Sequence, residues 1–217
     1  MASLLPGLSA RPPAGTRIML GLVGAPGAGK STVAQALLEA LGERAVVVPM
    51  DGFHLANVQL ERLGRRARKG AEDTFDSAGY AALLQRLRRR EPEQVVYAPD
   101  FRREIDEAVA GAIAVGPQVE LIITEGNYLL LEQGAWAGVA GMLDHIWYID
   151  IDPLERRRRL VERHMRFGRS AAQAEAWVRD TDEPNARLIE AGRARADLII
   201  GSDGGVTPGM PAARRTR

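Results

Sequence analysis

The amino-acid sequence predicts an α/β fold in which a mainly parallel sheet of about five strands carries helices on both faces. Two features of the sequence support this prediction. From residue 18 to residue 200, short apolar runs typical of buried strands alternate with segments that have helical spacing. A glycine-rich segment, Gly24–Thr32, separates the first apolar run from the first helical segment.

Length and composition predict a single domain. The chain has 217 residues, of which 46% are hydrophobic, enough for one well-filled core but not for two ordinary domains. Both ends are rich in Gly and Pro and show no periodicity. We therefore expect a folded domain at residues 17–200, with flexible tails at 1–16 and 201–217.

Charge and cysteine content narrow the classes of function. The net charge of +1 gives no excess of positive charge that would indicate nucleic acid or an anionic membrane as a partner. The absence of cysteine excludes disulfides and thiolate metal sites. The N-terminal segment lacks the basic start and apolar core of a signal peptide, and no stretch reaches the roughly 20 apolar residues of a membrane span. We therefore expect a cytoplasmic protein.

The segment Gly24–Ser31 matches the phosphate-loop pattern G-x-x-x-x-G-K-[ST]. A predicted strand at 18–23 precedes it and a predicted helix at 32–41 follows it, which is the context that the motif requires. We expect Lys30 to reach the β- and γ-phosphates of ATP, and the Ser31 hydroxyl to ligate Mg²⁺. The fold is thus predicted to be the three-layer P-loop NTPase fold. The predicted nucleotide-binding residues are Gly24, Ala25, Gly27, Ala28, Gly29, Lys30, Ser31 and Thr32.

Asp51 and His54 follow the second predicted strand, at 45–48. If this strand lies beside the phosphate-loop strand, Asp51 sits at the same edge of the sheet as the γ-phosphate. A carboxylate there can accept the proton of an attacking hydroxyl. An Asp-Gly turn without a catalytic role is the alternative. His54 is either a substrate contact or a hydrogen-bonded structural residue.

The middle of the chain predicts a helix and further strands. Ser77 can cap a helix that runs to Arg90, with its arginines on a solvated face. A strand at 94–97 leads into a loop that Pro99 keeps irregular, and a short extra strand is expected at 112–115. The strand at 121–124 ends in Glu125, where a carboxylate can hold Mg²⁺ together with Ser31, directly or through water.

Strands at 145–151 and 197–200 enclose two helical segments, 154–166 and 171–193. Asp152-Pro153 opens the first of these helices. Its run of arginines at 156–159 is most simply a solvated or ion-paired face.

The segment Asp51-Gly52-Phe53-His54, with Asn57, Leu60 and residues 68–76, resembles the uridine kinase, phosphoribulokinase and type I pantothenate kinase group of P-loop kinases. Within that group the chain is most similar to bacterial uridine kinase-like and fructose-transport-system kinases. The resemblance runs from about residue 18 to residue 200. It does not specify the phosphate acceptor.

The resemblance implies roles for particular residues. Asp51 is the catalytic base, and Lys69 lies in the loop that bounds the acceptor pocket, with a solvated loop charge as the alternative for Lys69. Asp100, with Arg102 or Arg103, helps to hold the acceptor, unless these residues form ordinary loop ion pairs.

The resemblance also implies an arginine-rich lid at about 160–178 that closes over the triphosphate. Arg163 and Arg169 are then the catalytic arginines that contact phosphate. The segment Asp182-Glu183-Pro184-Asn185 also resembles the family, and its role is left open.

Together these features predict a kinase that uses ATP and Mg²⁺ to phosphorylate a hydroxyl of a sugar, a nucleoside or a pantothenate-like molecule. The expected partner is this small-molecule acceptor, and a homodimer is left open. Three alternatives remain. A nucleotide-monophosphate kinase would not need Asp51 as a base, a regulatory ATPase would have no acceptor, and a nucleic-acid-binding module would use the arginine clusters.

Overall fold

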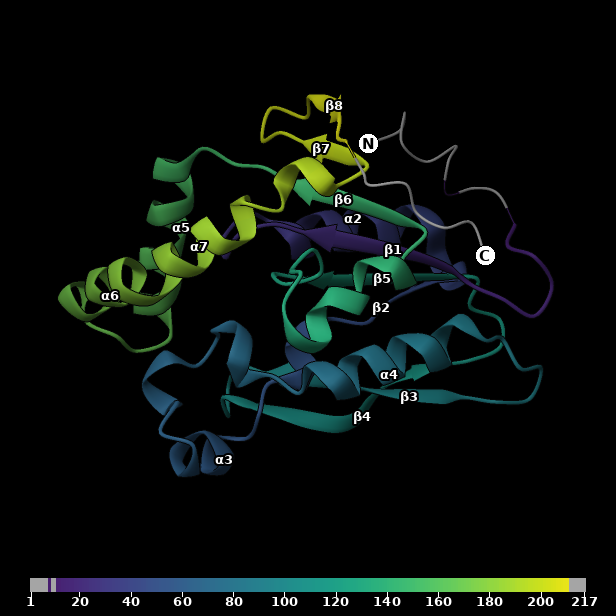
Figure 1. Cartoon of the computed structure of the whole chain (residues 1–217), viewed down its shortest axis with the longest axis horizontal. Coiled ribbons are helices and arrows are strands. Elements are labelled where there is room, and N and C mark those ends of the chain that lie inside the picture. The colour runs from purple at the N-terminus through teal and green to yellow at the C-terminus, as the bar shows by residue number, and fades with distance from the viewer. Residues whose placement is uncertain (1–7, 9–10, 211–217) are drawn as a thin grey trace.

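The computed structural model describes residue 8 and residues 11–210, so parts of both predicted tails lie outside it. Its centre is a six-stranded sheet in the order β2-β5-β1-β6-β7-β8 (Figure 1). All neighbouring strands are parallel except β7 and β8. The prediction of a mainly parallel α/β sheet is confirmed. The strands are β1 (Ile18–Val23), β2 (Ala45–Val47), β5 (Leu121–Gly126), β6 (His145–Ile149), β7 (Leu198–Ile200) and β8 (Val206–Pro208).

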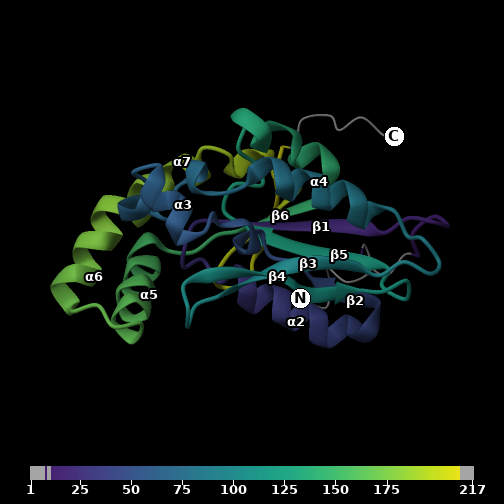
Figure 2. The same ribbon diagram turned by 90° about the horizontal axis from the view of Figure 1, so that it is seen from below.

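Both faces of the sheet are buried, because successive side chains of each strand point to opposite sides. In β1, Met19 and Val23 belong to one hydrophobic cluster, and Leu20 and Leu22 belong to the other. Helix α4 (Ser77–Arg88) packs into the first cluster and α2 (Lys30–Leu41) into the second. Figure 2 shows these two helices on opposite faces of the sheet. The predicted three-layer arrangement is therefore present.

The strand predicted at 94–97 lies outside this sheet. It is part of β3 (Val96–Arg102), which pairs with β4 (Glu107–Val115) in a separate antiparallel hairpin. Pro99 does not end the regular structure as expected. The pairing instead shifts register between Ala98 and Asp100, which accommodates a residue without an N–H group. In Figure 1 the hairpin lies beyond the β2 edge of the sheet, next to α4.

Three further boundaries differ from the predictions. The cap of α4 is Asp76, which accepts the Gly79 N–H at 2.8 Å, and not Ser77. The helical segment predicted at 171–193 is divided into α6 (Ala171–Trp177), a π-helical segment (Val178–Asp182) and α7 (Glu183–Glu190). The folded domain was predicted to end at residue 200, whereas β8 extends the sheet beyond it.

The topology brings several loops to one edge, because parallel strands share their carboxyl ends. The phosphate loop follows β1, Asp51 follows β2, and Glu125 lies at the end of β5. Helix α5 (Pro153–Arg166) follows β6 and is capped by Asp152. Helices α5 and α6 project from this end of the molecule, near α3 (Asn57–Arg62) (Figure 2). Within the described ranges, no helix is long and apolar enough to cross a membrane.

Arg17 joins α4 to the loop before β5. Its side chain is buried, and its guanidinium donates to the carbonyl oxygens of Leu87 and Arg89 at the end of α4. It also donates to Gly116 and Val119, both at 3.0 Å. Burial lowers the pKa of this guanidinium. The positive charge suits the end of a helix, where carbonyl groups lack partners.

Replacing Arg17 by methionine should lower the free energy of unfolding by about 3 kcal/mol, because four carbonyl groups lose a charged donor. Urea unfolding measures this change. Arg44→Met is the matched control, because Arg44 also pairs at 2.7 Å, with Glu120, but its side chain is 44% exposed. The control should lose less than about 1 kcal/mol. Equal losses in the two variants would contradict the assigned role of Arg17.

Candidate active site

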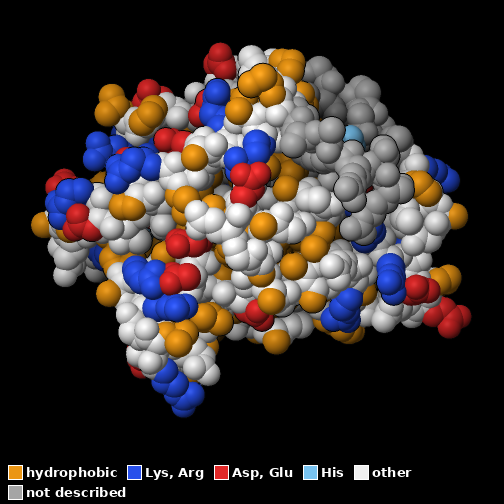
Figure 3. Space-filling model, viewed as in Figure 1, with side chains coloured by type: hydrophobic (Ala, Val, Ile, Leu, Met, Phe, Trp, Pro, Cys, Tyr) orange, Lys and Arg blue, Asp and Glu red, His pale blue; other side chains and the backbone are white. Residues whose placement is uncertain are grey.

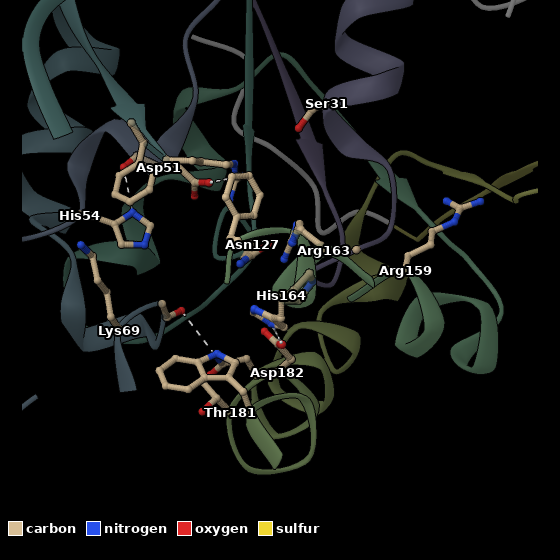
Figure 4. Close-up of a pocket in the computed structure, with 18 of the residues that line it drawn as sticks. Ser31, Asp51, His54, Lys69, Asn127, Arg159, Arg163, His164, Thr181 and Asp182 are labelled. Atoms are coloured by element: carbon tan, nitrogen blue, oxygen red, sulfur yellow. Dashed lines mark hydrogen bonds and ion pairs between the residues drawn. The ribbon is translucent and has the colours of Figure 1, made fainter. Parts of the chain in front are cut away.

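A cleft of about 810 Å³ opens at the carboxyl ends of the parallel strands. Figure 4 shows Ser31, Asp51, Lys69 and Arg163 arranged around this space. The phosphate loop forms one wall. The loop residues that line the cleft are Pro26, Gly27, Gly29, Lys30, Ser31 and Thr32. The other predicted loop residues, Gly24, Ala25 and Ala28, are outside this lining, and the two alanines are buried.

The Lys30 ammonium is held at the base of the cleft. It donates to the carbonyl oxygens of Gly24 at 2.9 Å and Ala25 at 3.2 Å, and to Asn127 Oδ1 at 2.8 Å. Burial lowers the pKa of Lys30, and the carboxylates of Glu125 and Asp51 oppose this effect. Asn127 was not predicted, although it follows β5 at the edge where ligands of parallel sheets bind.

The phosphate loop is packed against α5. Gly27 has a φ of 82°, and a Cβ at this position would lie 2.9 Å from Leu160 Cγ and 3.2 Å from the Arg156 carbonyl oxygen. Only glycine fits this approach. Arg159 of the same helix also lines the cleft. The phosphate loop and α5 are therefore in direct contact.

The arginine run of α5 at 156–159 is ion-paired, as predicted. Arg158 and Arg159 pair with Glu155, each at 2.8 Å. Arg156 is buried, and its Nη2 donates to Glu183 Oε1 at 2.7 Å. Arg156 is therefore ion-paired, as predicted, but it is buried and not solvated, because this face of α5 packs against the start of α7.

Ser31 and Glu125 form the candidate metal site. The Ser31 hydroxyl donates to Glu125 Oε1 at 2.7 Å. Hydroxyl and carboxylate oxygens are the ligands that Mg²⁺ prefers, so the two residues fit the ion. No group of three or more His, Asp or Glu side chains suited to a metal occurs among the described residues. Phosphate oxygens and waters would complete the coordination, as they commonly do for Mg²⁺.

Asp51 lies in a 3₁₀ turn, Met50–Phe53, and lines the cleft. Its carboxylate is 3.7 Å from Arg103 Nη2. The turn packs closely on β3, because a Cβ at Gly52 would lie 2.4 Å from the Pro99 carbonyl oxygen. This close packing fixes the direction in which the turn presents Asp51.

His54 has a structural role and also lines the cleft. A carbonyl oxygen only accepts, so the 2.8 Å contact between His54 Nδ1 and the Asp51 carbonyl places a proton on Nδ1. The ring lies between Phe75 and Phe101, with centroids at 4.0 and 4.7 Å. Burial lowers the pKa of His54, which favours the neutral ring with an accepting Nε2.

Lys69 is not the solvated loop charge that was the alternative. Its side chain is buried, and burial lowers its pKa. The ammonium donates to Asn57 Oδ1 at 2.7 Å and to the Asp106 carbonyl oxygen, and lies 3.3 Å from Asp106 Oδ2. It thereby joins the loop after α3 to the β3–β4 turn while lining the cleft.

The structure does not bring Asp100 and Arg102 into the cleft. They lie 3.6 Å apart and form an ion pair within β3, in keeping with the ion-pair alternative that was left open. Phe101 and Arg103 line the cleft instead. Neighbouring side chains of a strand point to opposite sides, so Phe101 and Arg103 face the cleft while Asp100 and Arg102 face away from it. Of the two arginines named for the acceptor pocket, Arg103 is the one at the cleft.

The two predicted lid arginines both line the cleft. Burial lowers the pKa of Arg163, and the nearby Arg103 lowers it further. Arg169 lies over the Trp177 ring, with its guanidinium carbon 3.9 Å from the ring centroid. Its Nη1 is 2.6 Å from His164 Nδ1.

Positive charge is concentrated in the cleft. Eight Lys and Arg side chains line it, against five Asp and Glu side chains. On the face shown in Figure 3, basic and acidic side chains are interspersed. A polyanion such as a triphosphate therefore fits the cleft, and Asp51 is placed to accept a proton beside it.

The chain is similar to several known proteins over most of its length, although it matches no protein-family model. It is 39% identical over 159 residues to an ATP-dependent kinase-like protein of Aspergillus versicolor, which covers 70% of this chain and 92% of the relative. It is 34% identical over 195 residues to a candidate uridine kinase of Schizosaccharomyces pombe. This match covers 85% of this chain and 83% of the relative. The crystal structure of a candidate fructose transport system kinase from Silicibacter sp. TM1040 has a TM-score of 0.82 and 40% identity, covering 91% of this chain and 97% of that one.

Glu125→Gln should melt at a higher temperature than the wild type at neutral pH. Burial raises the pKa of Glu125, so its ionised form costs stability above that pKa. The difference between the variants should shrink as the pH falls through the raised pKa, because the wild-type side chain then becomes neutral. Thermal melts across this pH range test the expectation. A wild type that is more stable than Glu125→Gln at neutral pH would contradict it.

Proposed function

This chain belongs to the uridine kinase-like family of P-loop kinases, and we propose that it transfers the γ-phosphoryl group of ATP to a hydroxyl of a small molecule. One observation carries the proposal. The Asp51 carboxylate, the Lys30 ammonium and the Ser31–Glu125 pair line the same cleft, although they follow three different strands. This set combines a proton acceptor with groups that suit a triphosphate and its metal.

The phosphate loop supplies the nucleotide side of the site. Its N–H groups and the N-terminus of α2 suit phosphate oxygens. The Lys30 ammonium exchanges its contacts with Gly24 and Ala25 for the β- and γ-phosphates. Ser31 and Glu125 would hold Mg²⁺, which neutralises charge on the phosphates when bound. Arg163 and Arg169 supply further positive charge from the lid.

Asp51 supplies the acceptor side. The hydroxyl of the acceptor lies against the Asp51 carboxylate and attacks the γ-phosphorus in line with the leaving oxygen. Its proton passes to an oxygen of Asp51, and ADP leaves with the bridging oxygen. Arg103, which lies beside Asp51, keeps positive charge next to the transferred group. The lid excludes water, which would otherwise take the phosphoryl group.

The acceptor class that we propose is a sugar, a nucleoside or a pantothenate-like compound. Two relatives support the first two classes, since one is a candidate uridine kinase and the other a candidate fructose transport system kinase. The acceptor side of the cleft includes Phe75, Phe101 and the accepting Nε2 of His54. These groups suit a compound with both apolar and hydroxyl surface. We place the reaction in the cytoplasm, in keeping with a chain without cysteine.

Asp51→Asn should reduce acceptor-dependent turnover by about 10²–10⁴, the usual contribution of a positioned general base. This loss is roughly 3–5 kcal/mol of transition-state stabilisation. ATP affinity should stay within a few-fold, because Asp51 faces the acceptor. Steady-state kinetics and ATP titration measure the two quantities. Asp100→Asn is the matched control, since Asp100 lies outside the cleft lining and should keep the wild-type rate.

Full acceptor-dependent turnover by Asp51→Asn would contradict the hydroxyl-kinase mechanism. If nucleoside monophosphates then served as acceptors, the nucleotide-monophosphate kinase alternative would replace it. A loss of the same size in Asp100→Asn would show that the effect does not depend on a carboxylate in the cleft.

A further inference from the structure

A chain of polar contacts lies behind Arg169 in the lid. Asp182 Oδ2 is 2.7 Å from His164 Nε2, and His164 Nδ1 is 2.6 Å from Arg169 Nη1. The guanidinium of Arg169 lies over Trp177. Asp182 is buried, and the His164 side chain is 13% exposed. Figure 4 shows His164 and Asp182 joined at the side of the cleft.

The contacts determine the protonation of His164. A guanidinium only donates hydrogen bonds, so Nδ1 of His164 must offer its lone pair to Arg169. The ring proton is therefore on Nε2, where it is donated to Asp182. The carboxylate thus selects the tautomer that can bind Arg169, as carboxylates do for other histidines.

The π-helical segment places Asp182 and Trp177 on the same side. The N–H of Glu183 bonds to the Val178 carbonyl oxygen, five residues back. A π-helical turn joins residues that are five apart, whereas an α-helical turn joins residues that are four apart. Trp177 and Asp182 are five residues apart, and both line the cleft. The π-helical turn thereby presents the ring and the carboxylate to the Arg169–His164 pair.

The segment that carries Asp182 is anchored to the rest of the molecule. Glu183 accepts from the buried Arg156 at 2.7 Å. The Asn185 amide donates to the carbonyl oxygen of Gly70 at 3.4 Å. Gly70 follows Lys69 in the loop on the acceptor side. Asp182 is therefore fixed relative to the cleft by contacts on the residues that follow it.

We propose that His164 and Asp182 are positioning residues that hold Arg169 in the orientation in which it binds the triphosphate. The inference rests on the proposed function in one respect, namely that Arg169 meets phosphate. The contact with His164 is the only side-chain hydrogen bond of Arg169 in the described part of the chain, and Arg169 lines the cleft, so its other N–H groups have no side-chain partner there. Holding a long, flexible side chain in place before binding reduces the entropy that binding costs.

Two substitutions of His164 separate its contact with Arg169 from its contact with Asp182. In His164→Asn, the amide oxygen takes the place of Nδ1 and can accept from Arg169, but the side chain does not reach Asp182. In His164→Gln, the amide nitrogen takes the place of Nε2 and can donate to Asp182, but nothing accepts from Arg169. The measurement is ATP affinity, by calorimetric titration with Mg²⁺ and without an acceptor, so that a change in the acceptor side does not enter it.

We expect His164→Gln to weaken ATP binding about tenfold, as befits the loss of one charge-assisted contact to phosphate. His164→Asn should restore most of the lost affinity. Asp180→Ala is the control for the π-helical segment, because Asp180 is exposed and pairs with Arg179, and it should bind ATP as the wild type does. Asp182→Ala should weaken binding. Thermal melts show whether each variant is folded.

Equal losses in His164→Asn and His164→Gln would overturn the inference, since a merely structural histidine fails in both. Unchanged or tighter binding in His164→Gln would also overturn it, the latter because His164 would then hold Arg169 away from the nucleotide. Arg169→Ala with wild-type ATP affinity would overturn the inference as well. The proposed function is tested by acceptor-dependent turnover and this inference by ATP affinity. The inference and the proposed function can therefore fail separately.

Discussion

The buried ammonium of Lys30 is the group on which the rest of the site depends. A buried cation is stable only where acceptors and opposite charges surround it. The carbonyl oxygens of Gly24 and Ala25 come from the loop after β1, and the Asn127 oxygen comes from the end of β5. The carboxylates of Glu125 and Asp51 add negative charge from β5 and from the turn after β2. Three strands must therefore be adjacent before Lys30 can be buried, and the order β2-β5-β1 provides this.

The same edge of the sheet also places helix α5. Helix α5 follows β6 and packs on the phosphate loop at Gly27, so the arginines of α5 approach the nucleotide side of the cleft. The loop after α3 and the β3–β4 turn form the opposite wall, and Lys69 joins them. In our proposal, the wall at the phosphate loop binds the nucleotide and the opposite wall binds the acceptor. This division suits a transfer reaction better than simple hydrolysis, which needs no second side.

The sequence predicted the parts of the site that follow strands of the central sheet. The phosphate loop, Asp51 and Glu125 each come directly after an apolar run, so their shared edge follows from the topology of a parallel sheet. Where tertiary packing decides the position of a side chain, that position could not be predicted from the sequence. Arg103 lines the cleft and Arg102 does not, because of the register of a hairpin that the sequence presented as part of the sheet. Arg156 is buried because α7 covers it. Pro184 follows the π-helical turn at the start of α7, but a proline marks a break in a helix without predicting that the preceding turn is π-helical.

The central claim is that the cleft has a second substrate whose hydroxyl receives the phosphoryl group. Formation of ADP by the purified protein, with ATP and Mg²⁺, should be measured with and without each member of a panel of sugars, nucleosides and pantothenate. We predict that ADP forms only slowly by itself, and that at least one compound accelerates it while becoming phosphorylated in equal amount. ADP formation at the same rate with and without every compound, together with release of inorganic phosphate, would contradict the claim.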